Sequence, residues 1–259
     1  MKKFIVVLLI VFSVFPLAAQ TAEYYYMRGL IYVQKEDLDL AIADFTRAIN
    51  LNPYDAYYWI DRGNAYLDKG NEERAIEDFN RAISLDPQED SAFFSRGAAY
   101  HTMGNLDKAM DDYNKAITLA PNEASYWAER GNIYLDKNDP DRAIADYTKA
   151  ISIDPNLESA FTSRGEAYLA KGDNNRAIED LTKAISLNPN QETSWLARGD
   201  ALIEMGEFDK AIADINKAIS LNPYNPEAWN SRSRAYLEKG DFEQAIRDLD
   251  KAIELEPNG

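Results

Sequence analysis

Apolar and small residues recur along this chain at the spacing expected of helices. Between residues 56 and 89, Trp59, Gly63 and Tyr66 are separated by four and three positions, which places them on one face of a helix. A second stripe with helical spacing follows, and it consists of Ala75, Ile76, Phe79, Ala82 and Ile83. Gly70 separates the two stripes and Pro87 follows the second. The stretch therefore predicts two helices joined by a tight turn.

This pattern repeats every 34 residues, and single residue types mark the period. Glycine recurs at Gly29, Gly63, Gly97, Gly131, Gly165 and Gly199. Proline recurs at Pro53, Pro87, Pro121, Pro155, Pro189, Pro223 and Pro257. All four tryptophans share one position of the unit, namely Trp59, Trp127, Trp195 and Trp229. We therefore predict seven helical hairpins, at 22–55, 56–89, 90–123, 124–157, 158–191, 192–225 and 226–259. They must stack, because a single hairpin cannot bury both of its faces.

The turn inside each unit has its own signature. Glycine ends the first helix at Gly70, Gly104, Gly172, Gly206 and Gly240. A glycine there can adopt the left-handed conformation that closes a helix, and Asn138 tolerates it in the fourth unit. Glu36 does not favour this conformation, so we expect a looser turn in the first unit. The next position is mostly Asp or Asn, which can cap the second helix.

Small residues and one pair of charged residues define the contact between the two helices. The Gly29 position and the Ala41 position predict a close approach, and Ser233 replaces glycine in the last unit but is small enough to let the hairpin close. Every unit has an arginine, at Arg28, Arg62, Arg96, Arg130, Arg164, Arg198 and Arg232. Every unit also has an aspartate, at Asp44, Asp78, Asp112, Asp146, Asp180, Asp214 and Asp248. An antiparallel hairpin brings these positions to similar heights, so we predict an Arg–Asp pair in each unit. A basic ladder that recognises an acidic ligand is the functional alternative.

These residues resemble the tetratricopeptide repeat (TPR), in the bacterial form that carries an Arg-Gly pair. The second unit shows the motif almost whole, as Trp59, Gly63, Tyr66, Gly70, Ala75, Phe79, Ala82 and Pro87. The resemblance covers residues 22–259 and implies an all-α fold, a right-handed superhelical solenoid of antiparallel helix pairs. It also implies a protein–protein interaction scaffold that holds a peptide or protein segment in an inner groove lined by the first helices, with no enzymatic activity and no cofactor.

The resemblance assigns the groove to five positions of the first helix. Candidate peptide-binding residues at these positions are Tyr26, Tyr57, Ile60, Asn64, Phe94, His101 and Asn132. The groove is expected to be apolar and aromatic in the first three units and acidic beyond them, as at Glu166 and Asp200. A groove filled by its own side chains is the alternative. The family members that grip a terminal carboxylate need basic residues at groove positions where this chain has none, so that specificity is excluded.

The N-terminal residues have the layout of a secretory signal. Lys2 and Lys3 precede an apolar run at 4–15, and Leu17-Ala18-Ala19 offers small residues for cleavage. We therefore expect residues 1–19 to be a signal peptide, and the mature chain to lie in a bacterial periplasm or outside the cell. An uncleaved membrane anchor is the alternative, although the run is shorter than the roughly 20 residues that span a bilayer.

Composition narrows the classes of partner. The chain has 44 acidic and 28 basic residues, and its formal net charge of −16 argues against nucleic acid as a ligand. It contains no cysteine and one histidine, so neither a disulfide nor a histidine-rich metal site is expected. No nucleophile motif or glycine-rich phosphate loop is present. We expect a protein or peptide partner, no small-molecule cofactor, and membrane contact only if the signal segment is retained.

The last predicted helix offers a second kind of contact. Ile246, Leu249 and Ile253 belong to its apolar stripe, and no polar capping helix follows them. This end of the array either frays or stacks against another chain. Self-association through this face, as a structural element of an envelope complex, is therefore the alternative function.

Overall fold

The computed structural model describes residues 21–256, which form fourteen α-helices. The chain divides into two compact parts, one ending at Gly104 and the other beginning at Asn105. From here on we call these parts the first unit and the second unit, and each contains several of the 34-residue repeats. The helices of the first unit are α2 (Ala22–Gln34), α3 (Leu38–Leu51), α4 (Ala56–Asp68), α5 (Glu72–Leu85) and α6 (Asp90–Thr102). In the unit that begins at Asn105 they are α7 (Leu106–Leu119), α8 (Ala124–Asp136), α9 (Pro140–Ile153), α10 (Glu158–Ala170), α11 (Asn174–Leu187), α12 (Glu192–Glu204), α13 (Phe208–Leu221), α14 (Pro226–Lys239) and α15 (Phe242–Leu255). The predicted signal peptide at 1–19 lies outside the described residues. Along the described part of the chain, no helix has both the length and the apolar character needed to cross a membrane.

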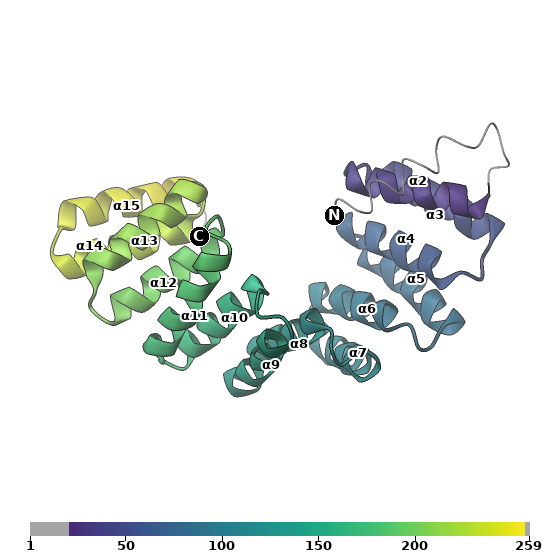
Figure 1. Cartoon of the computed structure of the whole chain (residues 1–259). Helices are drawn as coiled ribbons and strands as arrows, with labels where there is room; N and C mark the ends of the chain where they lie inside the picture. Colours follow the sequence, from purple (N-terminus) through teal and green to yellow (C-terminus); the bar gives the residue numbers. More distant parts are fainter. Residues whose placement is uncertain (1–20, 257–259) are drawn as a thin grey trace. The chain divides into compact units, whose positions relative to one another are not determined.

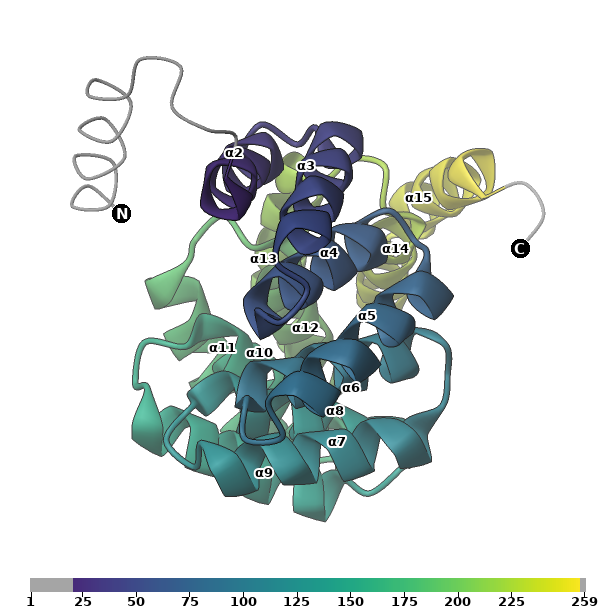
Figure 2. The same ribbon diagram turned by 90° about the vertical axis from the view of Figure 1, so that its right-hand side faces the viewer.

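Within each unit the helices pack as hairpins that stack in chain order (Figures 1 and 2). In the first unit, α2 pairs with α3 and α4 with α5, and α6 packs on α5. In the second unit, α8 pairs with α9, α10 with α11, α12 with α13 and α14 with α15, while α7 packs on α8. First helices also contact the first helix of the next hairpin, as α2 contacts α4 and α12 contacts α14. The predicted all-helical repeat of antiparallel pairs is confirmed.

Glycine on the first helix lets the two helices of a hairpin approach closely. A Cβ added at Gly63 would lie 2.6 Å from Cε1 of Phe79, and one added at Gly199 would lie 2.5 Å from Cγ1 of Ile215. Real Cβ atoms do not approach other atoms this closely, so a side chain at these positions would push the helices apart. Ser233 is accommodated in the last hairpin, where it is buried and its hydroxyl donates to the Asn230 carbonyl at 2.7 Å.

The turn at Glu36 differs from the sequence-based expectation. Glu36 adopts φ 61°, the left-handed conformation that Gly70 adopts at φ 72°. Its backbone N–H donates to Val33 O and the following N–H, of Asp37, donates to Tyr32 O, both at 2.9 Å, as in the glycine turns. The prediction of a looser turn was therefore wrong. The surrounding hydrogen bonds hold Glu36 in a conformation that disfavours a side chain.

Replacing Glu36 by glycine should therefore stabilise the protein. The expected gain is about 1 kcal/mol, because the exposed Glu36 side chain makes no described contact and the left-handed strain is removed. Denaturant unfolding followed by circular dichroism measures this difference. The converse substitution, Gly70→Glu, should destabilise by about the same amount. A loss of stability in Glu36→Gly would contradict the strain argument.

The predicted Arg–Asp pair is present in each of the six hairpins whose two helices both lie in the first unit or both lie in the second unit. Arg130 donates from Nε to Asp146 Oδ2 at 2.7 Å and from Nη2 to Asp146 Oδ1 at 2.8 Å. The same two-bond pair joins Arg28 to Asp44, Arg62 to Asp78, Arg164 to Asp180, Arg198 to Asp214 and Arg232 to Asp248. The aspartates are buried and the arginines are mostly buried. The arginines therefore hold the hairpins together and do not form a free basic ladder.

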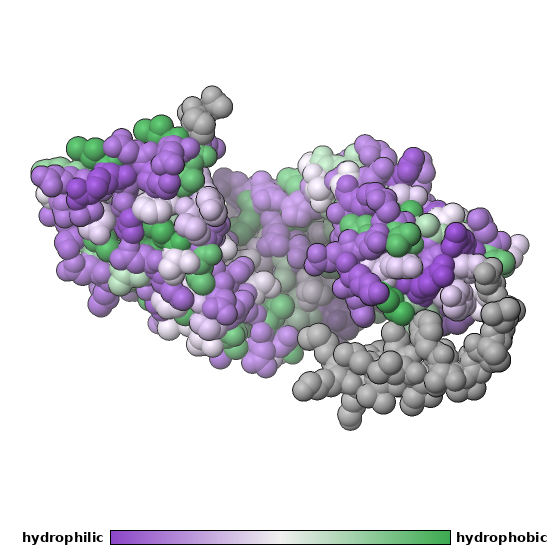
Figure 3. Space-filling model, turned by 90° about the horizontal axis from the view of Figure 1, so that it is seen from above, coloured by the Kyte–Doolittle hydropathy of each residue, from purple (hydrophilic) through white to green (hydrophobic). Residues whose placement is uncertain are grey.

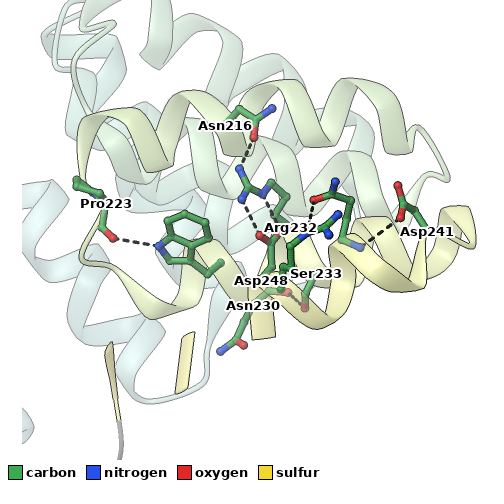
Figure 4. A network of polar contacts seen from close by, with 10 residues as sticks. Asn216, Pro223, Asn230, Arg232, Ser233, Asp241 and Asp248 are labelled. Atoms are coloured by element: carbon green, nitrogen blue, oxygen red, sulfur yellow. Dashed lines mark hydrogen bonds and ion pairs between the residues drawn. The ribbon is translucent and has the colours of Figure 1, made fainter. Parts of the chain in front are cut away.

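From the second hairpin onward, the remaining arginine nitrogen, Nη1, connects each hairpin to the one before it. Nη1 of Arg232 donates to Asn216 Oδ1 at 2.6 Å while its other nitrogens hold Asp248 (Figure 4). The same bond to the preceding second helix is made to Thr46, Asn80, Asn114, Thr148 and Thr182 by the arginines that follow them. One guanidinium group thus fixes both the hairpin and its register on its neighbour.

Two further contacts recur at the same boundaries. Trp229 Nε1 donates to the Pro223 carbonyl of the preceding hairpin at 3.0 Å, and the Arg232 guanidinium lies 4.7 Å from the centroid of its ring. A lysine at the end of the first helix also pairs with an aspartate in the first turn of the preceding second helix. These pairs are Lys69–Asp39, Lys137–Asp107, Lys171–Asp141 and Lys239–Asp209.

Removing the carboxylate of one buried pair should destabilise the array strongly. Asp146→Ala leaves the Arg130 guanidinium without its buried partner, which costs roughly 3–5 kcal/mol. Asp141→Ala is the matched control, because Asp141 belongs to the exposed Lys171 pair and its loss should cost less than about 1 kcal/mol. Denaturant unfolding monitored by helical circular dichroism compares the two. Equal stability of the two variants would contradict the structural role of the Arg–Asp pair.

Candidate functional site

Six of the seven candidate residues lie on the adjacent first helices of the first unit. Tyr26 is on α2, Tyr57, Ile60 and Asn64 are on α4, and Phe94 and His101 are on α6. Helix α4 contacts both α2 and α6, so these helices present one continuous face. Asn132 lies on α8 in the second unit and is therefore described separately.

Tyr26 lies at the centre of an aromatic and acidic cluster. Its ring lies 4.8 Å from the Tyr58 ring and 5.9 Å from the Phe45 ring, measured between centroids. Its hydroxyl donates to Asp61 Oδ2 at 2.8 Å. Burial, together with the negative charge of Asp61, raises the pKa of Tyr26 far above its ordinary value. Tyr26 therefore stays protonated and remains a hydrogen-bond donor.

Asp61 is a half-buried carboxylate that no cation neutralises in the described part of the chain. Burial raises the pKa of Asp61, and the hydrogen bond from Tyr26 opposes this shift. The nearby Asp55 adds negative charge. An anion in this environment attracts a positively charged ligand, because a bound cation offsets the charge that burial has left poorly solvated.

Two more tyrosines on α4 bring carboxylates to the same face. The Tyr58 hydroxyl donates to Glu23 Oε2 at 3.4 Å, and burial raises the pKa of Tyr58 to about 12. Tyr57 is 54% exposed, and a hydrogen bond with Glu89 raises the pKa of its hydroxyl. We call the surface formed by Glu23, Tyr26, Tyr57, Asp61 and Glu89 the acidic aromatic face.

The carboxylates of this face were missed by sequence reasoning, which expected the groove of the first three repeats to be apolar and aromatic. Asp61 directly follows Ile60 and occupies a groove position. The family resemblance links this position to binding specificity only when the residue there is basic. An acidic residue there therefore carried no signal. Glu23 and Glu89 approach the face through tyrosine hydroxyl groups, and the sequence carries no signal for those contacts either.

The other candidates of the first unit differ in accessibility. Ile60 is only 4% exposed and packs with Ala82 and Ala92 between two hairpins, so it supports the face from beneath. Asn64, Phe94 and His101 are half-buried. Tyr57 therefore offers the most accessible apolar surface among the candidates on α4.

Asn132 is engaged within its own hairpin. Its Oδ1 accepts a hydrogen bond from the Tyr147 hydroxyl at 2.6 Å, and its Nδ2 donates to Glu129 Oε2 at 3.1 Å. These bonds orient the amide and use part of its hydrogen-bonding capacity. Its role as a contact for a ligand backbone stays a prediction.

Glu166 on α10 and Asp200 on α12 are half-buried acidic residues on the first helices of the second unit. Burial raises the pKa of Glu166 and of Asp200, and the charge of Glu227 adds to both shifts. Arg234 pairs with Asp200 at 2.8 Å and lies 3.7 Å from Glu204, so part of this charge is compensated. Within the described residues, no group of His, Cys, Asp or Glu is arranged to hold a metal ion.

A cleft of about 650 Å³ lies between α11, α12 and α13 in the second unit. Its lining includes Asn175 and Met205, which stand at the positions where other boundaries have an Asp–Lys pair. The cleft also contains the Arg198–Asp214 pair. The cleft lies at a hairpin boundary where Asn175 and Met205 stand in place of this ion pair.

Comparison with known families agrees with the repeat pattern. Models described as tetratricopeptide repeat or TPR repeat match residues 22–55, 63–104, 91–123, 131–172, 162–226 and 196–259. The chain belongs to the tetratricopeptide-repeat family, and its fold is that of a protein-interaction scaffold. A search of curated proteins found no match.

Several solved structures share this fold. The MamA protein is 30% identical with a TM-score of 0.57, and the match covers 65% of this chain and 92% of MamA. A TPR protein from Parabacteroides merdae is 21% identical with a TM-score of 0.71, and the match covers 93% and 95% of the two chains. YrrB, described as a TPR protein with an unusual peptide-binding site, is 23% identical with a TM-score of 0.57, covering 71% and 94%.

The pH dependence of stability should reveal the buried charge of Asp61. Because the folded state raises the pKa of Asp61, the wild type loses stability as the pH rises through that pKa. Asp61→Asn removes the charge and keeps an acceptor for the Tyr26 hydroxyl. We expect its melting temperature to equal or exceed that of the wild type at pH 7, and the gap to narrow toward pH 4.

Asp61→Ala is the control for the hydrogen bond. It leaves the Tyr26 hydroxyl without its acceptor, so it should be less stable than Asp61→Asn by roughly 1–3 kcal/mol. Thermal unfolding across this pH range tests both variants. A gap between Asp61→Asn and wild type that widens as the pH falls would show that Asp61 is stabilised as a carboxylate.

Proposed function

We propose that this protein is an exported scaffold that binds an extended basic segment of a partner protein on the acidic aromatic face. The observation that carries the proposal is the half-buried Asp61 carboxylate, which is hydrogen-bonded to Tyr26 and has no neutralising cation in the described residues. The first helices present this carboxylate beside exposed aromatic surface. Such a combination suits lysine or arginine side chains.

The chemistry of the face defines the segment that it fits. The aliphatic stem of a lysine or arginine packs on the Tyr57 ring, while its charged end reaches the carboxylates of Asp61 or Glu89. The Asn64 amide is available to bond the backbone of an extended chain. The acidic surface around Glu166 and Asp200 favours the same sign of ligand charge. A catalytic role has no support from this arrangement, because its acidic groups pair with tyrosines and form no nucleophile–base set.

Export belongs to the same proposal. Residues 1–19 would direct the chain to a bacterial periplasm or to the cell exterior and then be removed. Their removal takes away Lys2 and Lys3, and the formal net charge changes from −16 to −18. The mature chain is then more strongly attractive to a basic partner. A retained signal segment would instead place the scaffold at a membrane surface.

Binding of defined peptides tests this function. The probes are fluorescent peptides in which lysine alternates with leucine, and matched peptides with glutamate in place of lysine. We expect the purified chain to bind the lysine peptides, with lower affinity at high salt, and to show no binding of the glutamate peptides. The double variant Tyr57→Ala, Asp61→Asn should bind at least about tenfold more weakly, because it loses the exposed ring and the buried charge.

Tyr54→Ala is the matched control. Tyr54 is 77% exposed in the loop between α3 and α4, so this variant removes an aromatic ring outside the face. Its affinity should equal that of the wild type. Equal weakening in Tyr54→Ala, or equal binding of the glutamate peptides, would overturn the assignment of the acidic aromatic face.

A further inference from the structure

The boundaries between stacked hairpins share a set of contacts, and the boundary between α13 and α14 shows it completely. Arg232 on α14 bonds Asn216 on α13, and Lys239 pairs with Asp209. Beneath these polar contacts, the stripe of Ile212, Ile215 and Ile219 is at most 9% exposed, because α14 covers it. Each first helix therefore supplies cations, and each second helix supplies acceptors and an apolar stripe.

Helix α15 presents the same second-helix surface with nothing packed on it in the described residues. Its stripe consists of Phe242, Ile246, Leu249 and Ile253, which are between 44% and 64% exposed. Glu243 and Asp250 stand at the positions of Asp209 and Asn216. Both are exposed, and within residues 21–256 neither forms an ion pair. Figure 1 shows α15 at the edge of its unit, and Figure 3 shows hydrophobic residues, in green, among hydrophilic ones on that unit.

Helix α2 presents the complementary first-helix surface. Lys35 stands at the position of Lys239, is exposed, and has no acidic partner among residues 21–256. The Nη1 of Arg28 donates to the Tyr24 hydroxyl of its own helix at 3.2 Å, and no second helix among residues 21–256 precedes α2 to supply an acceptor. Tyr24 is 39% exposed, whereas Tyr58 at the same position of the next hairpin is 4% exposed.

We propose that α15 of one copy packs on α2 of a second copy, in the register of the boundary between α13 and α14. The Glu243 carboxylate would accept a hydrogen bond from the Lys35 ammonium group of the second copy. The Asp250 carboxylate would accept one from Nη1 of Arg28 of that copy. The apolar stripe of α15 would cover Tyr24 and the half-buried Ile31 of the second copy. This contact joins two different surfaces, so it builds a head-to-tail chain or a closed ring. It does not involve Tyr57 or Asp61 and stands apart from the proposed peptide binding.

A charge exchange between the two ends provides the test. Sedimentation velocity over a series of concentrations should show self-association of the purified wild type. Lys35→Glu alone places two acids at the contact, and Glu243→Lys alone places two lysines there. Each single variant should associate about tenfold more weakly than the wild type. A mixture of the two variants should regain wild-type association, because α2 of the Lys35→Glu variant then presents its new carboxylate to the new lysine on α15 of the Glu243→Lys variant.

Two further variants serve as controls. Lys183→Glu changes an exposed charge of the second unit away from both ends, and it should associate like the wild type. Ile246→Asp places a charge in the exposed stripe of α15 without disturbing the core, and it should be monomeric. A wild type that stays monomeric up to its solubility limit would overturn the proposal. So would association that Ile246→Asp abolishes but Lys35→Glu leaves unchanged, because α15 would then pack on a surface other than α2.

Discussion

The structure depends on one guanidinium group in each hairpin. In the six hairpins that lie within one unit, two of its nitrogens hold a buried aspartate on the facing helix. In all of these except the first hairpin, the third nitrogen holds a threonine or asparagine on the preceding hairpin. Because arginine has donors in a rigid planar fork, both bonds form only when the two helices and the neighbouring hairpin are in one register. An apolar stripe alone would tolerate sliding. The arginine therefore supplies specificity as well as stability, and glycine on the first helix lets the helices approach closely enough for it.

This division of roles leaves one surface free for function. The arginine, tryptophan and lysine contacts all lie at boundaries between first and second helices. The exposed residues of the first helices therefore take no part in these repeated structural contacts. Its composition consequently varies from hairpin to hairpin, from Tyr57 and Phe94 in the first unit to Glu166 and Asp200 in the second. The acidic aromatic face arises where Tyr26 on one first helix meets Asp61 on the next. A repeated scaffold thus acquires a local site through contacts between non-equivalent residues.

Periodicity was sufficient to predict the fold, because every unit places the same residue types at the same positions. The Arg130–Asp146 pair followed from antiparallel geometry alone, whereas the bond from Arg130 to Asn114 required the register between neighbouring hairpins. Glu36 was misjudged because the hydrogen bonds around a turn can impose a conformation that its residue disfavours. The site was harder to predict. Ile60 has the spacing of a groove residue and is nevertheless buried, and the bond between Tyr26 and Asp61 depends on how two side chains meet across helices.

The most direct measurement of the arginine constraint is NMR of the arginine side chains in the unmodified protein. Each paired Nε–H donates to a buried carboxylate, so its exchange with water should be slow. Among the pairs described above, slow exchange is predicted for the Nε–H of Arg28, Arg62, Arg130, Arg164, Arg198 and Arg232. The Nε–H groups of exposed arginines such as Arg81 should exchange rapidly. Slow exchange of these six beside rapid exchange of Arg81 would support the account, whereas uniformly rapid exchange would contradict it.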